Sequence, residues 1–208
     1  MSIILNNIYY RYKNNKHVNT ALDGIDLEIN AGEYVLITGM PGAGKTTLLK
    51  IICGLLKPDS GGISFSQGTT GYIPQYPEHM FFNKTVYEEI SFGPGNAGLS
   101  KQEVDNRVRD SMEITGLDFK TFSERSPFSL SAGEMRKCAI ASVVSRNPGT
   151  IVSDEPFSGL DEEGVEKING CFEKINSRGA TVILTATGEV PPGAARRRKA
   201  RMEKGKIP

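Results

Sequence analysis

The chain has 208 residues, and its 25 lysines and arginines nearly balance its 24 aspartates and glutamates, for a net charge of +1. This length predicts one compact domain, or one domain with an inserted lobe. A charge so close to zero gives no general field that would attract nucleic acid. The chain opens on no signal-peptide pattern and has no apolar run near the roughly 18 residues that a membrane span needs, so we expect any membrane role to come through a partner.

Short apolar runs and helical patterns alternate along the chain, and this alternation predicts a parallel sheet. The stretch 85–147 is mostly helical in pattern, with a capping box at Ser100 and Glu103, and it interrupts the alternation as an inserted lobe would. A later helix is expected to begin after Asp161. The expected strands are 3–10, 24–29, 33–38, two within 61–73, 150–153 and 180–185.

The three cysteines, Cys53, Cys138 and Cys171, are far apart, odd in number and in no metal-binding spacing. Cys138 and Cys171 fall within helical patterns. We therefore expect buried free thiols in a reducing compartment.

Residues 39–47 carry the pattern of a phosphate-binding loop between an expected strand and an expected helix. Glycines there let the backbone turn tightly and aim its N–H groups inward, and the helix start adds its positive dipole end. We expect Lys45 to reach the β- and γ-phosphates of a nucleotide and the Thr46 hydroxyl to bind Mg²⁺. The plainer alternative is a glycine-rich turn before an ordinary helix, which the flanking strand and helix make less favourable. The residues expected at the nucleotide are Gly39, Pro41, Gly42, Ala43, Gly44, Lys45, Thr46 and Thr47.

The segment Leu130-Ser-Ala-Gly-Glu134 reads as the start of a helix. Ser131 is a good N-cap, and Glu134 completes a capping box. The capping box alone is a sufficient structural explanation of this segment.

Residues 150–155 read as a buried strand that ends in two carboxylates. Such a strand end lies at the edge where open α/β sheets bind ligands. We expect Asp154 to hold Mg²⁺, directly or through water, and Glu155 to orient and deprotonate an attacking water. The alternative is an ordinary acidic pair at a strand-to-loop junction.

In this order and spacing, the motifs resemble those of the ATP-binding-cassette (ABC) ATPases, from residue 3 to about 185. The resemblance makes residues 39–46 the Walker A motif, 130–134 the signature motif with Ala132 where glycine is usual, 150–155 the Walker B motif, and 158–161 the D-loop. It makes Gln75 the Q-loop glutamine, which binds the metal and takes part in catalysis. It makes Tyr12 the aromatic residue that stacks on adenine, although Tyr9 and Tyr10 are close by.

The resemblance also implies an architecture and a mode of assembly. The fold is an α/β P-loop NTPase (RecA-like) core with an antiparallel β subdomain, formed by 1–75 and 148–208, and an inserted helical subdomain at about 76–147. Two cassettes, identical or different, close head to tail on ATP and Mg²⁺. Ser131, Gly133, Glu134 and Asp161 then serve the nucleotide held by the other subunit.

The stretch from Gln75 to Ser100, with Thr85-Val86 and Phe92-Gly93-Pro94, resembles the energy-coupling-factor and cobalt-transport ATPases. Those proteins drive importers of vitamins or transition metals. The resemblance implies an integral membrane transporter subunit as partner, a place at the cytoplasmic face of the cell membrane, and no specific nucleic acid.

Two features depart from the family. Thr187 stands where the family has a histidine that contacts the γ-phosphate, and threonine carries no charge and reaches less far. The segment 196–206 is strongly basic where the family has an apolar strand, and four consecutive cations cannot fill a buried strand. A solvated edge or tail is expected there, with contact to anionic lipid or to nucleic acid as alternatives.

Three functions fit these residues. The first is the ATP-hydrolysing motor of an importer. The second is a regulatory cassette, impaired in hydrolysis by the missing histidine, that lends its signature helix to a competent partner. The third is a soluble ABC protein without a transporter, against which the stretch 76–94 argues.

Overall fold

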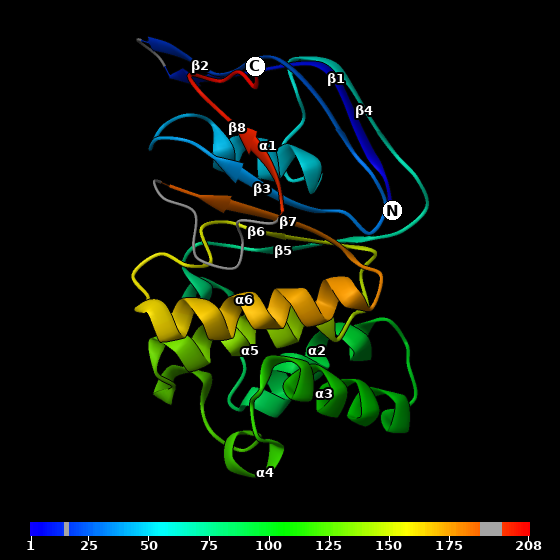
Figure 1. Ribbon diagram of the computed structural model, residues 1–208. Helices are drawn as coiled ribbons and strands as arrows, with labels where there is room; N and C mark the ends of the chain where they lie inside the picture. Colours follow the sequence, from blue (N-terminus) through cyan, green and yellow to red (C-terminus); the bar gives the residue numbers. More distant parts are fainter. Residues whose placement is uncertain (15–16, 188–196) are drawn as a thin grey trace.

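The computed structural model describes residues 1–14, 17–187 and 197–208, and it contains two sheets and two layers of helices (Figure 1). The smaller sheet is antiparallel, with the strand order β2-β1-β4. The larger sheet is parallel, with the order β5-β6-β7-β3-β8. The strands are β1 (Ile3–Asn14), β2 (His17–Ile29), β3 (Tyr34–Thr38), β4 (Ser60–Phe65), β5 (Thr70–Ile73), β6 (Thr150–Ser153), β7 (Thr181–Ala186) and β8 (Arg198–Arg201).

One helix lies between the two sheets, and the others lie on the far face of the parallel sheet (Figure 1). The enclosed helix is α1 (Lys45–Ile52). The remaining helices are α2 (Val86–Asn96), α3 (Lys101–Thr115), α4 (Phe119–Phe122), α5 (Ala132–Val144) and α6 (Glu162–Ser177), with short 3-10 turns η1 (Pro77–Met80) and η2 (Pro127–Ser129).

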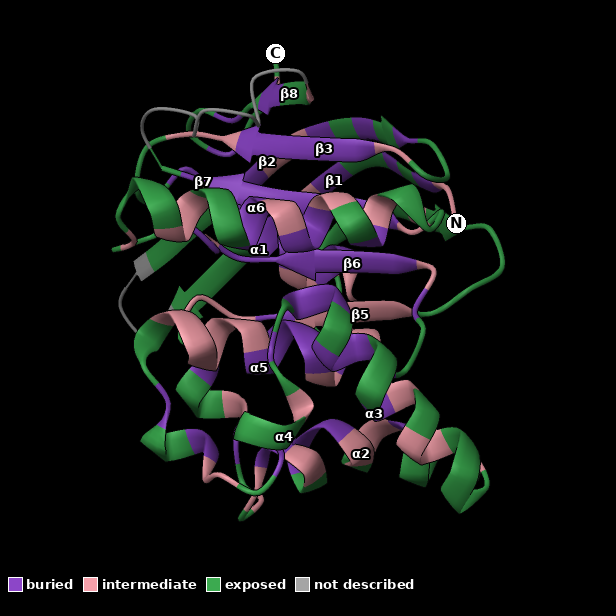
Figure 2. Cartoon of the chain, turned by 60° about the horizontal axis from the view of Figure 1, so that its bottom comes forward, coloured by how far each residue is buried: buried purple, intermediate pink, exposed green. Residues whose placement is uncertain are grey.

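The parallel sheet separates two hydrophobic cores. Along a strand, successive side chains point to opposite faces. In β3, Val35 and Ile37 therefore pack with α1 and the antiparallel sheet, while Tyr34 and Leu36 pack with α5 and α6. Figure 2 shows the consequence, since β3, β6 and β7 are buried along nearly their whole length.

The expected helix starts are confirmed. Ser100 and Ser131 each accept a hydrogen bond from the N–H three residues on, in complete capping boxes, and Asp161 accepts from the Gly164 N–H at 2.9 Å. These caps satisfy backbone donors that a helix start leaves without partners. The thiols of Cys138 and Cys171 are free and buried, as expected, and that of Cys53 is free and half-buried.

The first two strands are longer than the sequence predicted. The expected ranges were 3–10 and 24–29, but β1 and β2 continue outward as a hairpin in which Tyr12 pairs with Asn19. Residues 11–13 and 18–20 are exposed, so this part of the hairpin has no core and lacks the apolar alternation that marks a half-buried strand.

The basic C-terminal segment forms a solvated sheet edge, as expected. Among the described strands, β8 pairs only with β3, and Ala200 is buried while its neighbours in the strand are exposed. Several of its cations form ion pairs within the chain, at 2.6 Å between Arg197 and Glu173 and 3.0 Å between Arg198 and Glu33. Arg196 lies outside the described residues.

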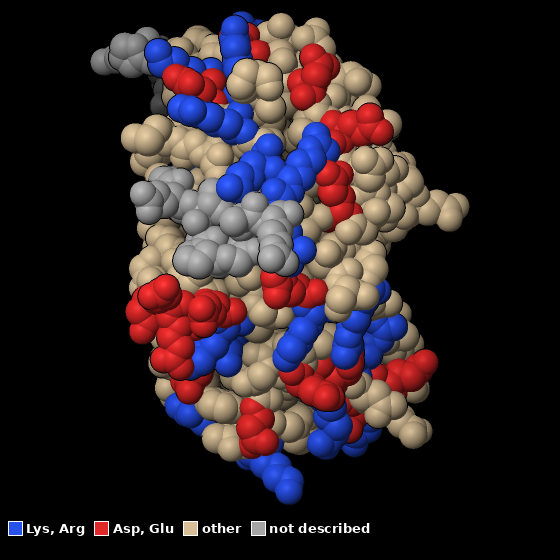
Figure 3. All heavy atoms as spheres, viewed as in Figure 1, with Lys and Arg blue, Asp and Glu red and all other residues tan. Residues whose placement is uncertain are grey.

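Charges of both signs are interspersed over the face drawn in Figure 3, in keeping with the net charge of +1. Over the described residues, we find no helix long and apolar enough to cross a membrane.

Candidate nucleotide-binding site

The turn from β3 into α1 can be made only with glycine at two positions. Gly44, at the N-cap of α1, has φ +101°, and a Cβ there would lie 2.3 Å from the Ala21 carbonyl oxygen. A Cβ on Gly39 would lie 2.3 Å from the Met202 carbonyl oxygen. Both distances are too short for real contacts, so the glycine spacing of the motif follows from this packing.

This turn forms one wall of a cavity of about 470 Å³ at the carboxyl ends of the parallel strands. The remaining walls come from the β1–β2 hairpin and from the residues that follow β5, β6 and β7. The lining residues are Tyr12, Asn19, Thr20, Ala21, Pro41, Gly42, Gly44, Lys45, Thr46, Thr47, Gln75, Glu155 and Thr187. Residues from six places in the chain thus converge on a single site.

Lys45 lies at the centre of the hydrogen bonds of this site. Its side chain is only 5% exposed, and its ammonium donates to the Gly39 carbonyl at 2.8 Å and to the Thr187 hydroxyl at 2.9 Å. The same ammonium lies 3.3 Å from Glu155 Oε1, and the Thr187 hydroxyl donates to this carboxylate oxygen as well. A buried cation held by several fixed acceptors is well placed to bind a phosphate group in place of the Glu155 carboxylate.

Thr46 and Asp154 supply the oxygen atoms that suit a divalent cation. The Thr46 hydroxyl donates to Asp154 Oδ2 at 2.6 Å, and Asp154 is almost fully buried at the end of β6. In the part of the chain that the structure describes, no group of three or more metal-binding side chains occurs. These two residues therefore fit Mg²⁺ that completes its coordination with nucleotide phosphates and water, as this ion usually does.

Tyr12 is the tyrosine of the three candidates that faces the cavity. It is 41% exposed, its hydroxyl lies 3.2 Å from Thr47 Oγ1, and its ring meets Tyr10 edge-on at 5.0 Å. Tyr10 instead packs against the core between the sheets, and the Tyr9 hydroxyl lies against Gly24. This placement supports Tyr12 as a platform for an aromatic base.

Six predicted nucleotide ligands do not line this cavity: Gly39 and Ala43 belong to the turn between β3 and α1, and four others lie at the starts of α5 and α6. Ser131, Gly133 and Glu134 are at the start of α5, and Asp161 caps α6. The Ser131 N–H, which donates to Glu134 at 2.8 Å, lowers the pKa of that carboxyl. Ser131, Glu134 and Asp161 are capping groups within this chain, and Gly133 lies in the first turn of α5, so a role at a nucleotide requires a second molecule.

Sequence reasoning missed the contributions of β2 and β7. Asn19 and Thr20 line the cavity because the hairpin extends beyond the predicted strands. The Thr185 hydroxyl in β7 contacts the Asp154 carboxylate and the Glu155 backbone N–H. The polar side chain of Thr185 in a mostly apolar strand was the signal in the sequence that could have revealed this role.

Two titratable groups, Tyr72 and Cys53, pack against the core between the two sheets. Burial raises the pKa of the Tyr72 phenol, and the Asp154 charge raises it further. Burial also raises the pKa of the Cys53 thiol to about 12. Both groups therefore stay protonated and neutral at neutral pH.

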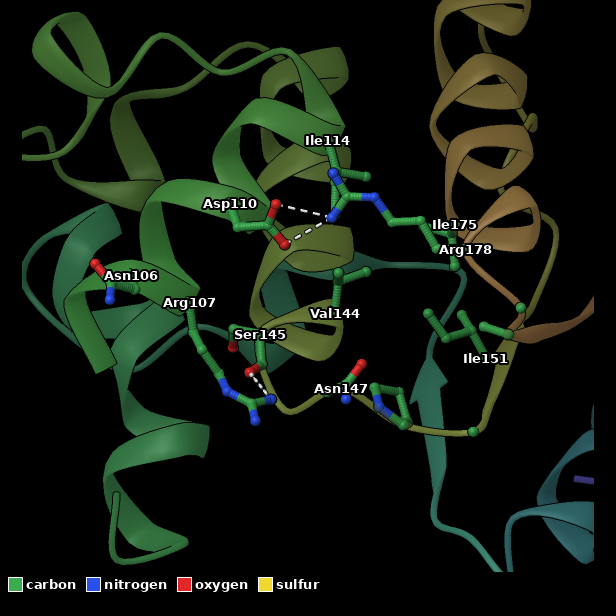
Figure 4. A pocket seen from close by; sticks show the side chains of 14 residues that line it. Asn106, Arg107, Asp110, Ile114, Val144, Ser145, Asn147, Ile151, Ile175 and Arg178 are labelled. Carbon is green, nitrogen blue, oxygen red and sulfur yellow. Dashed lines mark hydrogen bonds and ion pairs between the residues drawn. The ribbon is translucent and has the colours of Figure 1, made fainter. Parts of the chain in front are cut away.

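A second cavity, of about 520 Å³, opens at the opposite end of the parallel strands (Figure 4). It lies between α3, α5 and the end of α6, next to the residues that lead into β6 and β7. Arg178 closes one side with two hydrogen bonds to Asp110, at 2.7 and 2.8 Å, and Arg107 donates to the Ser145 carbonyl at 3.4 Å. Its cations are thus already engaged by the chain's own acceptors.

The family model for ABC transporters matches residues 22–158, which include most of the residues that line the nucleotide cavity. The chain belongs to the ABC transporter family. It is an ABC-type ATPase with the P-loop NTPase fold. Energy-coupling factor transporter ATP-binding protein EcfA2 of Clostridioides difficile is 37% identical over 202 residues, covering 89% of this chain and 70% of that protein. A putative ABC transporter ATP-binding protein of Methanosarcina mazei is 40% identical over 193 residues, covering 88% and 67%.

Solved ABC cassettes have the same fold over the whole chain. The dimeric post-hydrolysis structure of the cassette MJ0796, bound to ADP and Pi, matches with a TM-score of 0.87 at 26% identity, covering 99% of this chain and 96% of that one. CbiO1 of Clostridium perfringens, described as part of the ABC transporter complex CbiONQ, matches with a TM-score of 0.87 at 28% identity, covering 99% and 86%.

Proposed function

We propose that this ABC ATPase is the ATP-binding and ATP-hydrolysing subunit of a membrane importer of the vitamin or transition-metal type, driven by ATP-dependent closure of a dimer. The observation that carries the proposal is the convergence of Lys45, Thr46 and Glu155 on one cavity, with Asp154 hydrogen-bonded to Thr46 beside it. The likeness to EcfA2 and to CbiO1 supports the type of transporter.

Each residue then has a defined task at the nucleotide. The backbone N–H groups of the Gly39–Thr46 loop and the start of α1 cradle the phosphates, and Lys45 binds the β- and γ-phosphate oxygens. Glu155 Oε1 lies 3.3 Å from the Lys45 ammonium, so the phosphate oxygens compete with this carboxylate for the ammonium. Glu155, once released, orients the attacking water and accepts its proton, while Gln75 lines the same cavity beside it. When bound, Mg²⁺ neutralises charge on the transferred phosphoryl group.

Exposed aromatic side chains near Gln75 support a membrane partner. Tyr76 is 55% exposed, Phe82 63% and Phe92 47%, and the rings of Phe82 and Phe92 meet edge-on at 4.7 Å. Large exposed aromatic groups often mark a protein interface. We propose that an integral membrane subunit binds here and holds the ATPase at the cytoplasmic face of the membrane.

One observation favours the regulatory alternative as a second candidate. Thr187 occupies the position between Lys45 and Glu155 with a short neutral side chain. If its hydroxyl cannot stabilise the γ-phosphate, this chain binds ATP, hydrolyses it slowly and lends the start of α5 to a competent partner.

The test of ATP binding is the Lys45→Ala variant. Because this buried ammonium is the cation that lines the cavity, its removal should abolish measurable ATP binding in an equilibrium titration. Lys50→Ala, in the last turn of the same helix and outside the cavity lining, is the matched control and should bind ATP as the unaltered chain does. Equal affinity for Lys45→Ala and Lys50→Ala would refute the proposed site.

ATP turnover, measured on the purified chain alone and with its membrane partner, separates the two functions. The motor predicts turnover that rises when the membrane subunit is present. The regulatory subunit predicts binding with slow turnover in both conditions.

A further inference from the structure

Thr185 joins the two carboxylate residues of the Walker B strand through one hydroxyl group. It lies in β7, fully buried, directly beside the end of β6. Its hydroxyl donates to Asp154 Oδ1 at 2.7 Å and accepts from the Glu155 backbone N–H at 2.8 Å. We propose that Thr185 is a positioning residue for ATP hydrolysis, an inference that rests on the function proposed above.

The hydrogen-bond chemistry gives this contact a fixed direction. A hydroxyl has only one proton to donate, and the carboxylate of Asp154 takes it, so the backbone N–H of Glu155 meets a lone pair. The other oxygen of Asp154, Oδ2, accepts from the Thr46 hydroxyl at 2.6 Å. The Asp154 carboxylate is therefore held at both oxygens, and its rotation about the side chain is fixed.

The same hydroxyl holds an unusual backbone conformation. Glu155 has φ +44°, in the left-handed region that residues with a Cβ seldom adopt. Such conformations persist where the surroundings enforce them, and here the Thr185 hydroxyl binds the N–H of the strained residue. This turn aims the Glu155 side chain at Lys45 and Thr187. Loss of the hydroxyl should therefore loosen both the metal carboxylate and the general base.

Valine tests this role directly, because it has the shape of threonine without the hydroxyl. In Thr185→Val we expect kcat to fall about tenfold or more, as for the loss of a hydrogen bond to a charged group. The Mg²⁺ concentration for half-maximal turnover should rise, while the Kd for ATP measured in EDTA should stay within about twofold. Thr185→Ser keeps both hydrogen bonds and should recover most of the turnover.

The opposite end of β7 supplies a matched control. Thr181 is equally buried, accepts from the Gly32 N–H at 3.0 Å and donates to the Met1 carbonyl at 3.0 Å. Thr181→Val therefore removes the same number of hydrogen bonds from the same strand, away from the nucleotide cavity. It should lower thermal stability about as much as Thr185→Val and leave kcat and the Mg²⁺ dependence unchanged.

Turnover of Thr185→Val within twofold of the unaltered chain would overturn the inference, as would an equal loss of kcat in Thr181→Val. If Thr185→Val does not fold, Thr185→Ala replaces it with the same expectations. If the unaltered chain binds ATP but shows no turnover, the motor function fails on its own. The Mg²⁺ dependence of ATP binding then decides the inference, since it should weaken in Thr185→Val and not in Thr181→Val.

Discussion

Thr187 is the residue of the nucleotide cavity at which we expect the rate of hydrolysis to be set. It stands where the ABC family has a histidine, and its hydroxyl accepts from Lys45 at 2.9 Å and donates to Glu155. Thr187 therefore lies in the cavity of the chain's own P-loop, and its approach to the γ-phosphate stays a prediction. The residues that follow, 188–193, lie outside the described residues.

Thr187→His should raise basal ATP turnover at least about tenfold. An imidazole reaches further than a hydroxyl and can carry charge, and one preorganised donor contributes about 10²–10³ in rate when its neighbours suit it. We expect a gain below this range because the residues around position 187 are adapted to threonine. Steady-state phosphate release measures the effect, and Thr187→Asn, long but uncharged, is the control. A rate already typical of ABC ATPases, with no gain in Thr187→His, would show that another group does the histidine's work.

At the scale of elements, the loop before α2 depends on one buried carboxylate. Glu89, only 5% exposed, accepts at a single oxygen from the Phe82 N–H, the Asn83 N–H and the Asn83 side-chain amide, at 3.0–3.1 Å. Glu88, its neighbour, is exposed and caps the same helix through the Lys84 and Thr85 N–H groups. The two residues therefore differ in burial while making similar bonds.

Glu89→Ala should lower the free energy of unfolding by about 3 kcal/mol, because it leaves three part-buried donors without their acceptor. Glu88→Ala, whose donors regain water, should cost about 1 kcal/mol. Urea titrations of both variants measure the difference, and ATP affinity should be unchanged in each because neither residue lines the cavity. Equal destabilisation by the two substitutions would show that burial of Glu89 is unimportant.

The elements also show what sequence could predict. Local rules of spacing and capping govern the P-loop, the capped starts of α3, α5 and α6, and the strand 150–153. The predicted positions of these elements therefore agree closely with the structure. The outer β1–β2 hairpin was missed because residues 11–13 and 18–20 bury no core and so carry no periodic pattern. Thr185 was missed because its role depends on β7 lying beside β6, a pairing between distant segments.

At the scale of the molecule, the nucleotide cavity is lined by residues from both sheets. The β1–β2 hairpin comes from the antiparallel sheet, while Glu155 and Thr187 follow strands of the parallel sheet. A nucleotide bound between Tyr12 and Lys45 therefore contacts both sheets. The α5 and α6 helices begin at the same end of the parallel sheet as the cavity, because α5 leads into β6 and α6 leads out of it (Figure 1). Their capped starts are thus positioned to meet a second molecule.

The last prediction follows from this arrangement. Glu155→Gln keeps the shape of the side chain but removes the base, so ATP should bind without being hydrolysed and should hold a dimer together. We expect gel filtration of this variant to give twice the monomer mass in ATP and Mg²⁺, and monomer in ADP. The matched control, Lys45→Ala combined with Glu155→Gln, cannot hold the nucleotide and should stay monomeric in ATP. Monomer for Glu155→Gln in saturating ATP would contradict self-association, because the starts of α5 and α6 would then have no second copy to serve. A dimer that forms only when a different ABC ATPase is added would instead assign this chain to a heterodimer, with its signature helix at the partner's nucleotide.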